Sequence, residues 1–159
     1  MKLERGVAYW TLVAGSAAWV AAVALAPVAR ANGWWLAEWI YQAFQPICHQ
    51  MPGRSFVCLK EPFAACHRCF GLYLGFLVGL LVIPHWTWLR SRLEDNPRQI
   101  AWFFVPMLID IALGPFNRAP DRFLTGLIAA FPVAFPVWAA VTELAQRWSR
   151  KRKESYGLQ

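Results

Sequence analysis

The sequence has few charged residues for its length, and this scarcity decides its broad class. Only 16% of its 159 residues are Asp, Glu, Lys or Arg, whereas a soluble domain carries about 25%, and 58% are hydrophobic. An ordinary soluble domain is therefore excluded and a membrane protein is favoured. Acidic residues are the scarcer kind, and the net charge is +7. Because membrane proteins gather Lys and Arg on cytoplasmic loops, this charge indicates topology, and we expect no nucleic-acid partner.

Repetitive sequence is also missing, since the chain has no collagen-like or coiled-coil bias, no solenoid period and no low-complexity tract. Aromatic residues, by contrast, make up 16% of it. Large apolar side chains offset the entropy lost on ordering, so a disordered chain is excluded. We expect one integral membrane domain over residues 1–159.

Four stretches have about the 20 apolar residues that cross roughly 30 Å of hydrocarbon. They are Gly6 to Ala29, Phe70 to Leu89, Gln99 to Asn117 and Phe123 to Thr142. The third contains Asp110, an ionisable group that costs about 2.5–3.5 kcal/mol at a helix centre, but we still count it as a span. The expected fold is an all-α polytopic membrane bundle with four transmembrane helices.

The basic residues predict the orientation of this bundle. Ten lie on the side of both termini and six on the other, with the densest run from Arg147 to Lys153. By the positive-inside rule both termini face the cytoplasm, residues 143–159 form a basic cytoplasmic tail, and the loop over residues 30–69 is extracytoplasmic. We expect a multi-pass protein of the inner (plasma) membrane of a prokaryote.

The N-terminal segment has a second interpretation. Lys2 and Arg5, then an apolar stretch, then Ala29-Arg30-Ala31 resemble a secretory signal with a small-residue cleavage site. The apolar stretch exceeds the about 7–15 residues of a signal, so we favour an uncleaved first helix. Cleavage would leave three spans.

Between the first two spans, the segment from Asn32 to Ile47 mixes three Trp, a Tyr and a Phe with Glu38, Gln42 and Gln45. Trp and Tyr concentrate at the level of lipid headgroups, which favours an interfacial amphipathic helix on the extracytoplasmic side. A soluble helix packed on the outer loop is the alternative.

The second span begins with a glycine at every fourth position: Gly71, Gly75 and Gly79. This spacing puts three small residues on one helix face, where another backbone can approach closely. We expect this stripe to serve helix packing rather than chemistry.

All four cysteines and two of the three histidines fall between residues 48 and 69. The two-residue spacing of Cys66 and Cys69 lets two thiolates bind one ion, and a Cys-His pair upstream could complete a tetrahedral site. The expected ligands are Cys48, His49, Cys66 and Cys69, with Cys58 or His67 as substitutes because adjacent ligands are sterically awkward. Zinc is the expected ion, and the same thiolates also suit an iron–sulfur cluster.

Other functions stay open for the same residues. A Cys-x-x-Cys pair at a helix N-terminus favours thiol exchange, so Cys66 could be the exposed nucleophile and Cys69 the buried partner of a membrane thiol–disulfide oxidoreductase. An oxidising compartment would also allow two structural disulfides in any of three connectivities. A non-catalytic scaffold or assembly factor is the third class of function.

A second polar group is expected at the outer ends of the last two spans. Asp110 lies about five residues, or roughly 8 Å, inside the third helix, and Arg122 begins the fourth from the same end. An intramembrane carboxylate marks a candidate functional site, with Arg122 or Arg118 as its expected partner. A structural ion pair is the alternative. If zinc kept a water ligand, Asp110 could act as its base. With Cys66 from the thiol–disulfide hypothesis, the candidate catalytic residues are Asp110, Arg122 and Cys66.

Four arginines would make this outer mouth electropositive: Arg54, Arg68, Arg118 and Arg122. Guanidinium groups bind carboxylates and phosphates through paired hydrogen bonds. Besides the lipid bilayer, the expected partners are an anionic lipid or a phosphate or carboxylate ligand. The oligomeric state does not follow from the sequence.

The order of these motifs resembles a known family of small predicted membrane proteins, grouped as domain of unknown function 2085. The similar segments are Cys48-His49-Gln50, Arg54-Ser55-Phe56 and Cys66-His67-Arg68-Cys69-Phe70-Gly71-Leu72-Tyr73-Leu74-Gly75. The resemblance extends to Asp110 and to Arg122-Phe123-Leu124-Thr125-Gly126. It implies a membrane protein and supports the motif without implying a reaction.

Overall fold

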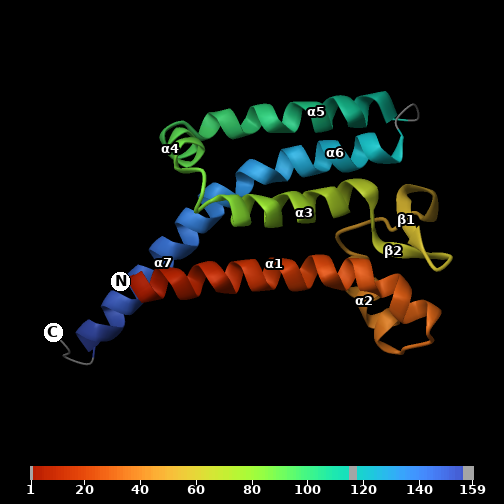
Figure 1. Cartoon of the computed structure of the whole chain (residues 1–159), viewed down its shortest axis with the longest axis horizontal. Coiled ribbons are helices and arrows are strands. Elements are labelled where there is room, and N and C mark those ends of the chain that lie inside the picture. The colour runs from red at the N-terminus through yellow and green to blue at the C-terminus, as the bar shows by residue number, and fades with distance from the viewer. Residues whose placement is uncertain (1, 115–117, 156–159) are drawn as a thin grey trace.

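The computed structural model describes residues 2–114 and 118–155, which are mostly α-helical (Figure 1). In chain order the elements are α1 (Lys2–Ala31), α2 (Leu36–Phe44), η1 (Pro52–Arg54), β1 (Ser55–Cys58), β2 (Glu61–Cys66), α3 (His67–Val82), α4 (Thr87–Asp95), η2 (Pro97–Gln99), α5 (Ile100–Leu113), α6 (Ala119–Ala130), η4 (Phe131–Val133) and α7 (Ala134–Ser155). Helix α1 packs on α3, α3 on α6, and α6 on α5. The strands, α2, the end of α5 and the start of α6 lie at one end of this row, and the N-terminus and α4 lie at the other.

Two helical segments of the described chain are long and apolar enough to cross a membrane. One is Gly6–Ala31 in α1, and the other runs over Ala119–Arg152 through α6, η4 and α7. A third candidate forms if α3 and α4, which meet at a bend of 116°, are counted as one broken span. The membrane class is thus supported, whereas four separate spans and the predicted topology are not confirmed.

Two predicted spans are shorter as helices than as apolar stretches. Helix α3 ends at Val82, and α5 has only 14 residues, or about 21 Å at 1.5 Å per residue. A hydrocarbon core of about 30 Å needs a longer helix than α5. Gly114, with a φ of 42°, ends α5 in a conformation that glycine adopts readily. Residues 115–117 of the predicted third span lie outside the described residues.

The glycine stripe of α3 serves close packing, as the sequence predicts, with Gly71 and Gly75 against α6 and Gly79 against η4 and the start of α7. A Cβ atom at Gly71 would overlap the carbonyl oxygen of Phe123, and one at Gly75 would overlap that of Leu127. Gly126 of α6 meets the carbonyl of Arg68 in the same way. The backbones of α3 and α6 therefore touch directly, which fixes the N-terminus of α3 beside the start of α6.

A small antiparallel sheet corrects the all-α expectation. Strands β1 and β2 pair in a register that places Ser55 opposite Cys66 and Cys58 opposite Glu61. Leu59 and Lys60 make the turn with positive φ values of 53° and 68°. The alternation signal of two strands this short is too weak to separate them from a loop by sequence.

Helix α2 lies within the predicted segment from Asn32 to Ile47 and buries Ala37, Tyr41 and Phe44 on one face. These side chains share a core cluster with Val23 of α1 and Ala65 of β2, and Cys48 belongs to that cluster. Cys48 is therefore held in a packed core, although the residues between it and α2 are exposed.

Candidate metal centre

Three cysteine sulfurs lie together at the sheet end of the helix row. The Sγ atoms of Cys48, Cys66 and Cys69 all lie within 4.8 Å of one another, and the thiols are free. Cys48 is 3% exposed, and the other two are partly buried. Tetrahedral zinc holds thiolates at about 2.3 Å, which puts the sulfurs about 3.8 Å apart. The three sulfurs therefore fit a single thiophilic ion with small side-chain shifts.

Separate segments bring these sulfurs together. Cys48 follows α2, and its N–H donates to the carbonyl of Phe44 at 2.9 Å. Cys66 ends β2 in an extended conformation and caps α3, so Cys69 falls in the first turn of that helix. The Cys66 N–H donates to the Sγ of Cys48 at 3.1 Å, which joins the start of α3 to the segment after α2.

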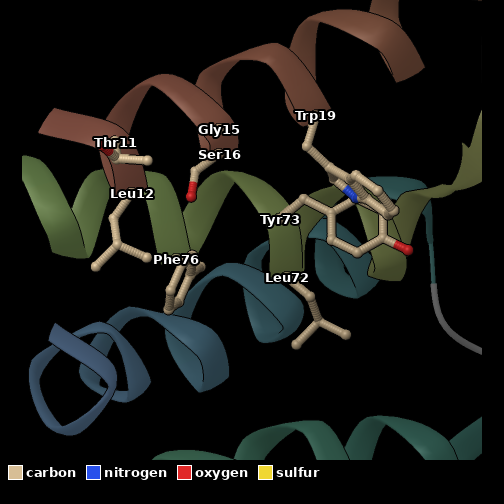
Figure 2. A pocket seen from close by; sticks show the side chains of 8 residues that line it. All are labelled: Thr11, Leu12, Gly15, Ser16, Trp19, Leu72, Tyr73 and Phe76. Carbon is tan, nitrogen blue, oxygen red and sulfur yellow. The ribbon is translucent and has the colours of Figure 1, made fainter. Parts of the chain in front are cut away.

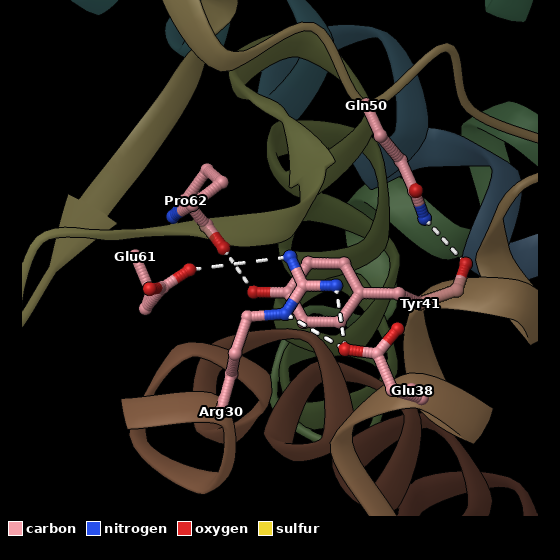
Figure 3. A network of polar contacts seen from close by, with 6 residues as sticks. All are labelled: Arg30, Glu38, Tyr41, Gln50, Glu61 and Pro62. Atoms are coloured by element: carbon pink, nitrogen blue, oxygen red, sulfur yellow. Dashed lines mark hydrogen bonds and ion pairs between the residues drawn. The ribbon is translucent and has the colours of Figure 1, made fainter. Parts of the chain in front are cut away.

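Gln50 and Tyr41 tie α2 to β2 through a network of hydrogen bonds (Figure 3). The Nε2 of Gln50 donates to the carbonyl of Tyr41 at 2.7 Å and to that of Ala64 at 3.0 Å. The Tyr41 hydroxyl donates to the carbonyl of Pro62. These hydrogen bonds from Gln50 and Tyr41 hold the segment that contains Cys48 against β2, the strand that ends at Cys66.

Arg30, in the last turn of α1, extends the same network (Figure 3). Its guanidinium carbon lies 3.7 Å from the centroid of the Tyr41 ring. Its Nη2 binds Glu38 at 2.9 Å, and its Nη1 lies 3.9 Å from Glu61. Because burial removes the phenolate from water, the pKa of Tyr41 is raised, and the hydroxyl stays a donor.

The surroundings of Cys48 favour its thiolate. Hydrogen bonds from the thiols of Cys66 and Cys69 lower the pKa of Cys48 far below its usual value, and backbone N–H groups of Cys66 and Gln50 act in the same direction. Burial raises the pKa, and this effect is smaller than that of either thiol hydrogen bond but larger than that of either backbone N–H. The N-terminus of α3 adds the partial positive charge of its free N–H groups. A thiolate is the form in which cysteine binds metals and attacks disulfides.

The other ligands expected from the sequence lie outside this group of sulfurs. His49 is exposed, and it lines a cavity that Cys66 also lines. Cys58 lies at the end of β1 opposite Glu61. His67 is buried edge-on to the ring of Phe56, with 4.4 Å between centroids, and its Nδ1 has no hydrogen-bond partner among the described residues.

Asp110 is buried at the end of α5, and the arginine that binds it differs from the expected ones. Arg68 in the first turn of α3 donates from Nε to the Asp110 Oδ2 at 2.9 Å, and its Nη2 contacts the same oxygen. Arg122 instead donates to the carbonyl of Gly114 at 3.0 Å. The backbone N–H of Arg118 donates to Asp121 at 3.1 Å. The predicted pairing with Arg122 or Arg118 is therefore corrected to Arg68, because the close α3–α6 contact brings the N-terminus of α3 beside α5.

A cavity of about 260 Å³ adjoins the cysteines. It is lined by His49, Met51, Arg54, Cys66, Arg68 and Arg122. Three of the four arginines expected to form an electropositive mouth thus face one cavity. Arg118 is exposed and does not line it.

A second, larger cavity of about 400 Å³ lies between α1 and α3 (Figure 2). Its walls are Thr11, Leu12, Gly15, Ser16 and Trp19 of α1 with Leu72, Tyr73 and Phe76 of α3. The Trp19 and Tyr73 rings meet edge to face, with 5.9 Å between centroids. None of these wall residues is Cys, His, Asp or Glu, so the cavity offers none of the usual metal ligands to the cysteine cluster.

Gln50 and Arg68 have roles that the sequence did not indicate. Gln50 stands directly after Cys48-His49, in a backbone conformation with a φ of 47°, and this turn directs its amide to β2. The signal available was its place in the Cys-His-Gln motif. Arg68 lies inside Cys66-His67-Arg68-Cys69, where its charge alone did not identify Asp110 as its partner.

The fold and this site define a helical membrane protein with a clustered cysteine site. The family described as "Predicted membrane protein (DUF2085)" matches residues 48–135, more than half of the chain, and the chain belongs to that family. It is also similar to the uncharacterized protein MJ1492 of Methanocaldococcus jannaschii, with 37% identity over 106 residues. That match covers 60% of this chain and 64% of the relative. No solved structure matches the chain.

Proposed function

We propose that Cys48, Cys66 and Cys69 bind a zinc ion at the extracytoplasmic face of the membrane. The observation that supports this is the convergence of three sulfurs, from the segment after α2 and from both sides of the start of α3, within 4.8 Å. Two sulfurs suffice for a disulfide, whereas three within 4.8 Å of one another can occupy three corners of a tetrahedron. Thiolates bind soft or borderline metal ions preferentially. Zinc is such an ion, and because its filled d shell imposes no geometry of its own, it accepts a tetrahedral set of ligands.

The fourth position of the ion faces the arginine-lined cavity in this proposal. Cys66 belongs to both the sulfur cluster and the cavity wall, and His49 lines the same wall directly after Cys48. A side-chain rotation of His49 would give a closed site with four protein ligands. A water in its place would give an open site that could activate that water.

Metal analysis of the full chain purified in detergent tests the proposal. We expect about one zinc per chain, with thiols of Cys48, Cys66 and Cys69 that react only after chelation. Cys48→Ser, Cys66→Ser and Cys69→Ser should each lose the ion. Cys58→Ser is the matched control, because Cys58 lies outside the cluster, and it should keep the ion.

Three results would contradict the zinc centre. One is metal-free protein whose thiols appear only after reduction. Another is an ion that Cys58→Ser loses as readily as Cys66→Ser does. The third is iron with sulfide, which would indicate a cluster instead. Cobalt substitution in His49→Ala then separates a closed from an open site, since loss of a nitrogen ligand changes the visible spectrum.

A membrane thiol–disulfide oxidoreductase is the second candidate, and the lowered pKa of the Cys48 thiol favours it. Cys48 is 3% exposed, so an incoming protein disulfide would have to react at Cys66 on the cavity wall. The double variant Cys48→Ser/Cys69→Ser removes both thiols that could resolve the intermediate, and it should then trap mixed disulfides through Cys66, visible on non-reducing gels. A zinc centre should trap none.

A further inference from the structure

We propose that the cavity beside the cysteines binds a phosphate group through Arg54, Arg68 and Arg122. This inference goes beyond the zinc centre, because its ligands are guanidinium groups and its occupant is an anion. The three side chains come from η1, α3 and α6, and they line one cavity of about 260 Å³. That volume is close to the lower end of ordinary ligand pockets, about 300 Å³, and suits a compact group.

The charges around the cavity do not cancel. Asp110 neutralises Arg68, and within the described part of the chain no carboxylate lies within 4.0 Å of a side-chain nitrogen of Arg54 or Arg122. A zinc ion with three thiolates would add one negative charge, which leaves a positive charge in the cavity. Arg122 is partly buried, where the lower local dielectric strengthens its attraction for an anion, and the exposed Arg54 adds a second guanidinium to the same cavity.

The chemistry favours phosphate over carboxylate. One guanidinium satisfies a carboxylate through two parallel hydrogen bonds, whereas a tetrahedral phosphate presents oxygens in several directions. Arg54, Arg68 and Arg122 belong to three separate elements. A phosphate can therefore accept hydrogen bonds from each of them through a different oxygen. Arg122 is already oriented, since its Nη2 donates to the carbonyl of Gly114 at 3.0 Å.

Free phosphate and a lipid headgroup share this chemistry, and the cavity lies where either could reach it. Arg68 and Arg122 are at the ends of α3 and α6 that lie beside the strands, near one end of the helix row (Figure 1). In the proposed topology this end meets the lipid headgroups. The experiment below therefore has one arm for each source.

The test titrates the full chain with inorganic phosphate in detergent by calorimetry, and with phosphatidic acid in nanodiscs by native mass spectrometry. We expect saturable binding in one arm, weakened about tenfold or more by Arg54→Gln and by Arg122→Gln, since each removes charge-assisted hydrogen bonds. Arg118→Gln, at the same end but outside the cavity, should bind as the wild type does. Binding in the first arm identifies a free phosphate ligand, and binding only in the second identifies a headgroup.

The inference is overturned if neither probe binds, or if Arg118→Gln weakens binding as much as Arg54→Gln does. Arg54 is exposed, and its side chain has no ion pair within the described chain, so Arg54→Gln should fold even if Arg122→Gln does not. Zinc is measured in the same samples. Full zinc content with no phosphate binding would reject the anion site alone, and phosphate binding without zinc would reject the metal centre alone.

Discussion

Arg68 and Asp110 join the first turn of α3 to the last turn of α5. The Arg68 Nε lies 2.9 Å from the Asp110 Oδ2, and the carboxylate side chain is only 3% exposed. This pair links the Cys66-x-x-Cys69 segment to a helix that is distant in sequence. It also neutralises one of the three arginines of the cavity.

Breaking this pair should destabilise the protein. Asp110→Asn leaves the Arg68 charge partly buried beside two other arginines, and loss of one partner of a buried pair costs about 3–5 kcal/mol in the free energy of unfolding. Reversible unfolding in detergent measures the free energy of unfolding of the variant and of the wild type. Glu143→Gln, which breaks an exposed pair with Arg147, should cost less than about 1 kcal/mol. The double variant Arg68→Met/Asp110→Leu should lose less than the two single changes together, and full additivity would contradict a coupled pair.

Gly75→Ala should push α3 away from α6. Its methyl group would overlap the carbonyl oxygen of Leu127, which belongs to a backbone that cannot rotate aside. We expect a loss of about 3 kcal/mol in the free energy of unfolding, at the upper end for overpacked cores. Gly15→Ala in α1 is the control, because a Cβ atom there has nothing within 4 Å, and it should be neutral or slightly stabilising. Equal effects of the two changes would refute direct backbone contact.

Gln50→Leu should loosen the metal centre without removing a ligand. It deletes the hydrogen bonds to the carbonyls of Tyr41 and Ala64 that set the Cys48 segment against β2. Groups that orient ligands change metal affinity by about tenfold to a hundredfold, and we expect a loss in that range by competition with a chromogenic chelator. Gln42→Leu, on the exposed face of α2, should leave affinity unchanged. Unchanged affinity in Gln50→Leu would mean that the sulfurs are held by other contacts.

Cys48 should carry a thiolate in the metal-free protein at neutral pH. Its pKa lies far below the usual 9.0, so between the two values the unfolded chain binds more protons than the folded one. The free energy of unfolding should therefore fall as the pH falls from about 9 toward acid. The ultraviolet absorbance of the thiolate measures the ionisation of Cys48 directly. Cys48→Ser should remove the neutral-pH signal and Cys58→Ser should keep it, whereas a signal that emerges only near pH 9 would contradict the prediction.

Patterns that depend on neighbouring residues were readable from the sequence. The long apolar stretch of α1, the glycine stripe of α3 and a helix within Asn32 to Ile47 all follow from local hydrophobicity or residue spacing. The helix ends were less predictable. The third apolar stretch continues to Asn117, but Gly114 ends α5 because its positive φ excludes helix continuation.

The sequence by itself determined the membrane class, the family resemblance and the segment that holds the cysteines, since hydrophobicity and residue spacing are written along the chain. The sequence also predicted that Cys48 joins Cys66 and Cys69 and that arginines gather at one mouth. Only the tertiary structure decided that His49 lies outside the group of sulfurs, that Arg68 binds Asp110, and that Arg118 lies outside the cavity. Those contacts depend on the rotation of α3 against α6 and on the register of a two-stranded hairpin. Both are set by packing between segments far apart in the chain, which no local pattern encodes.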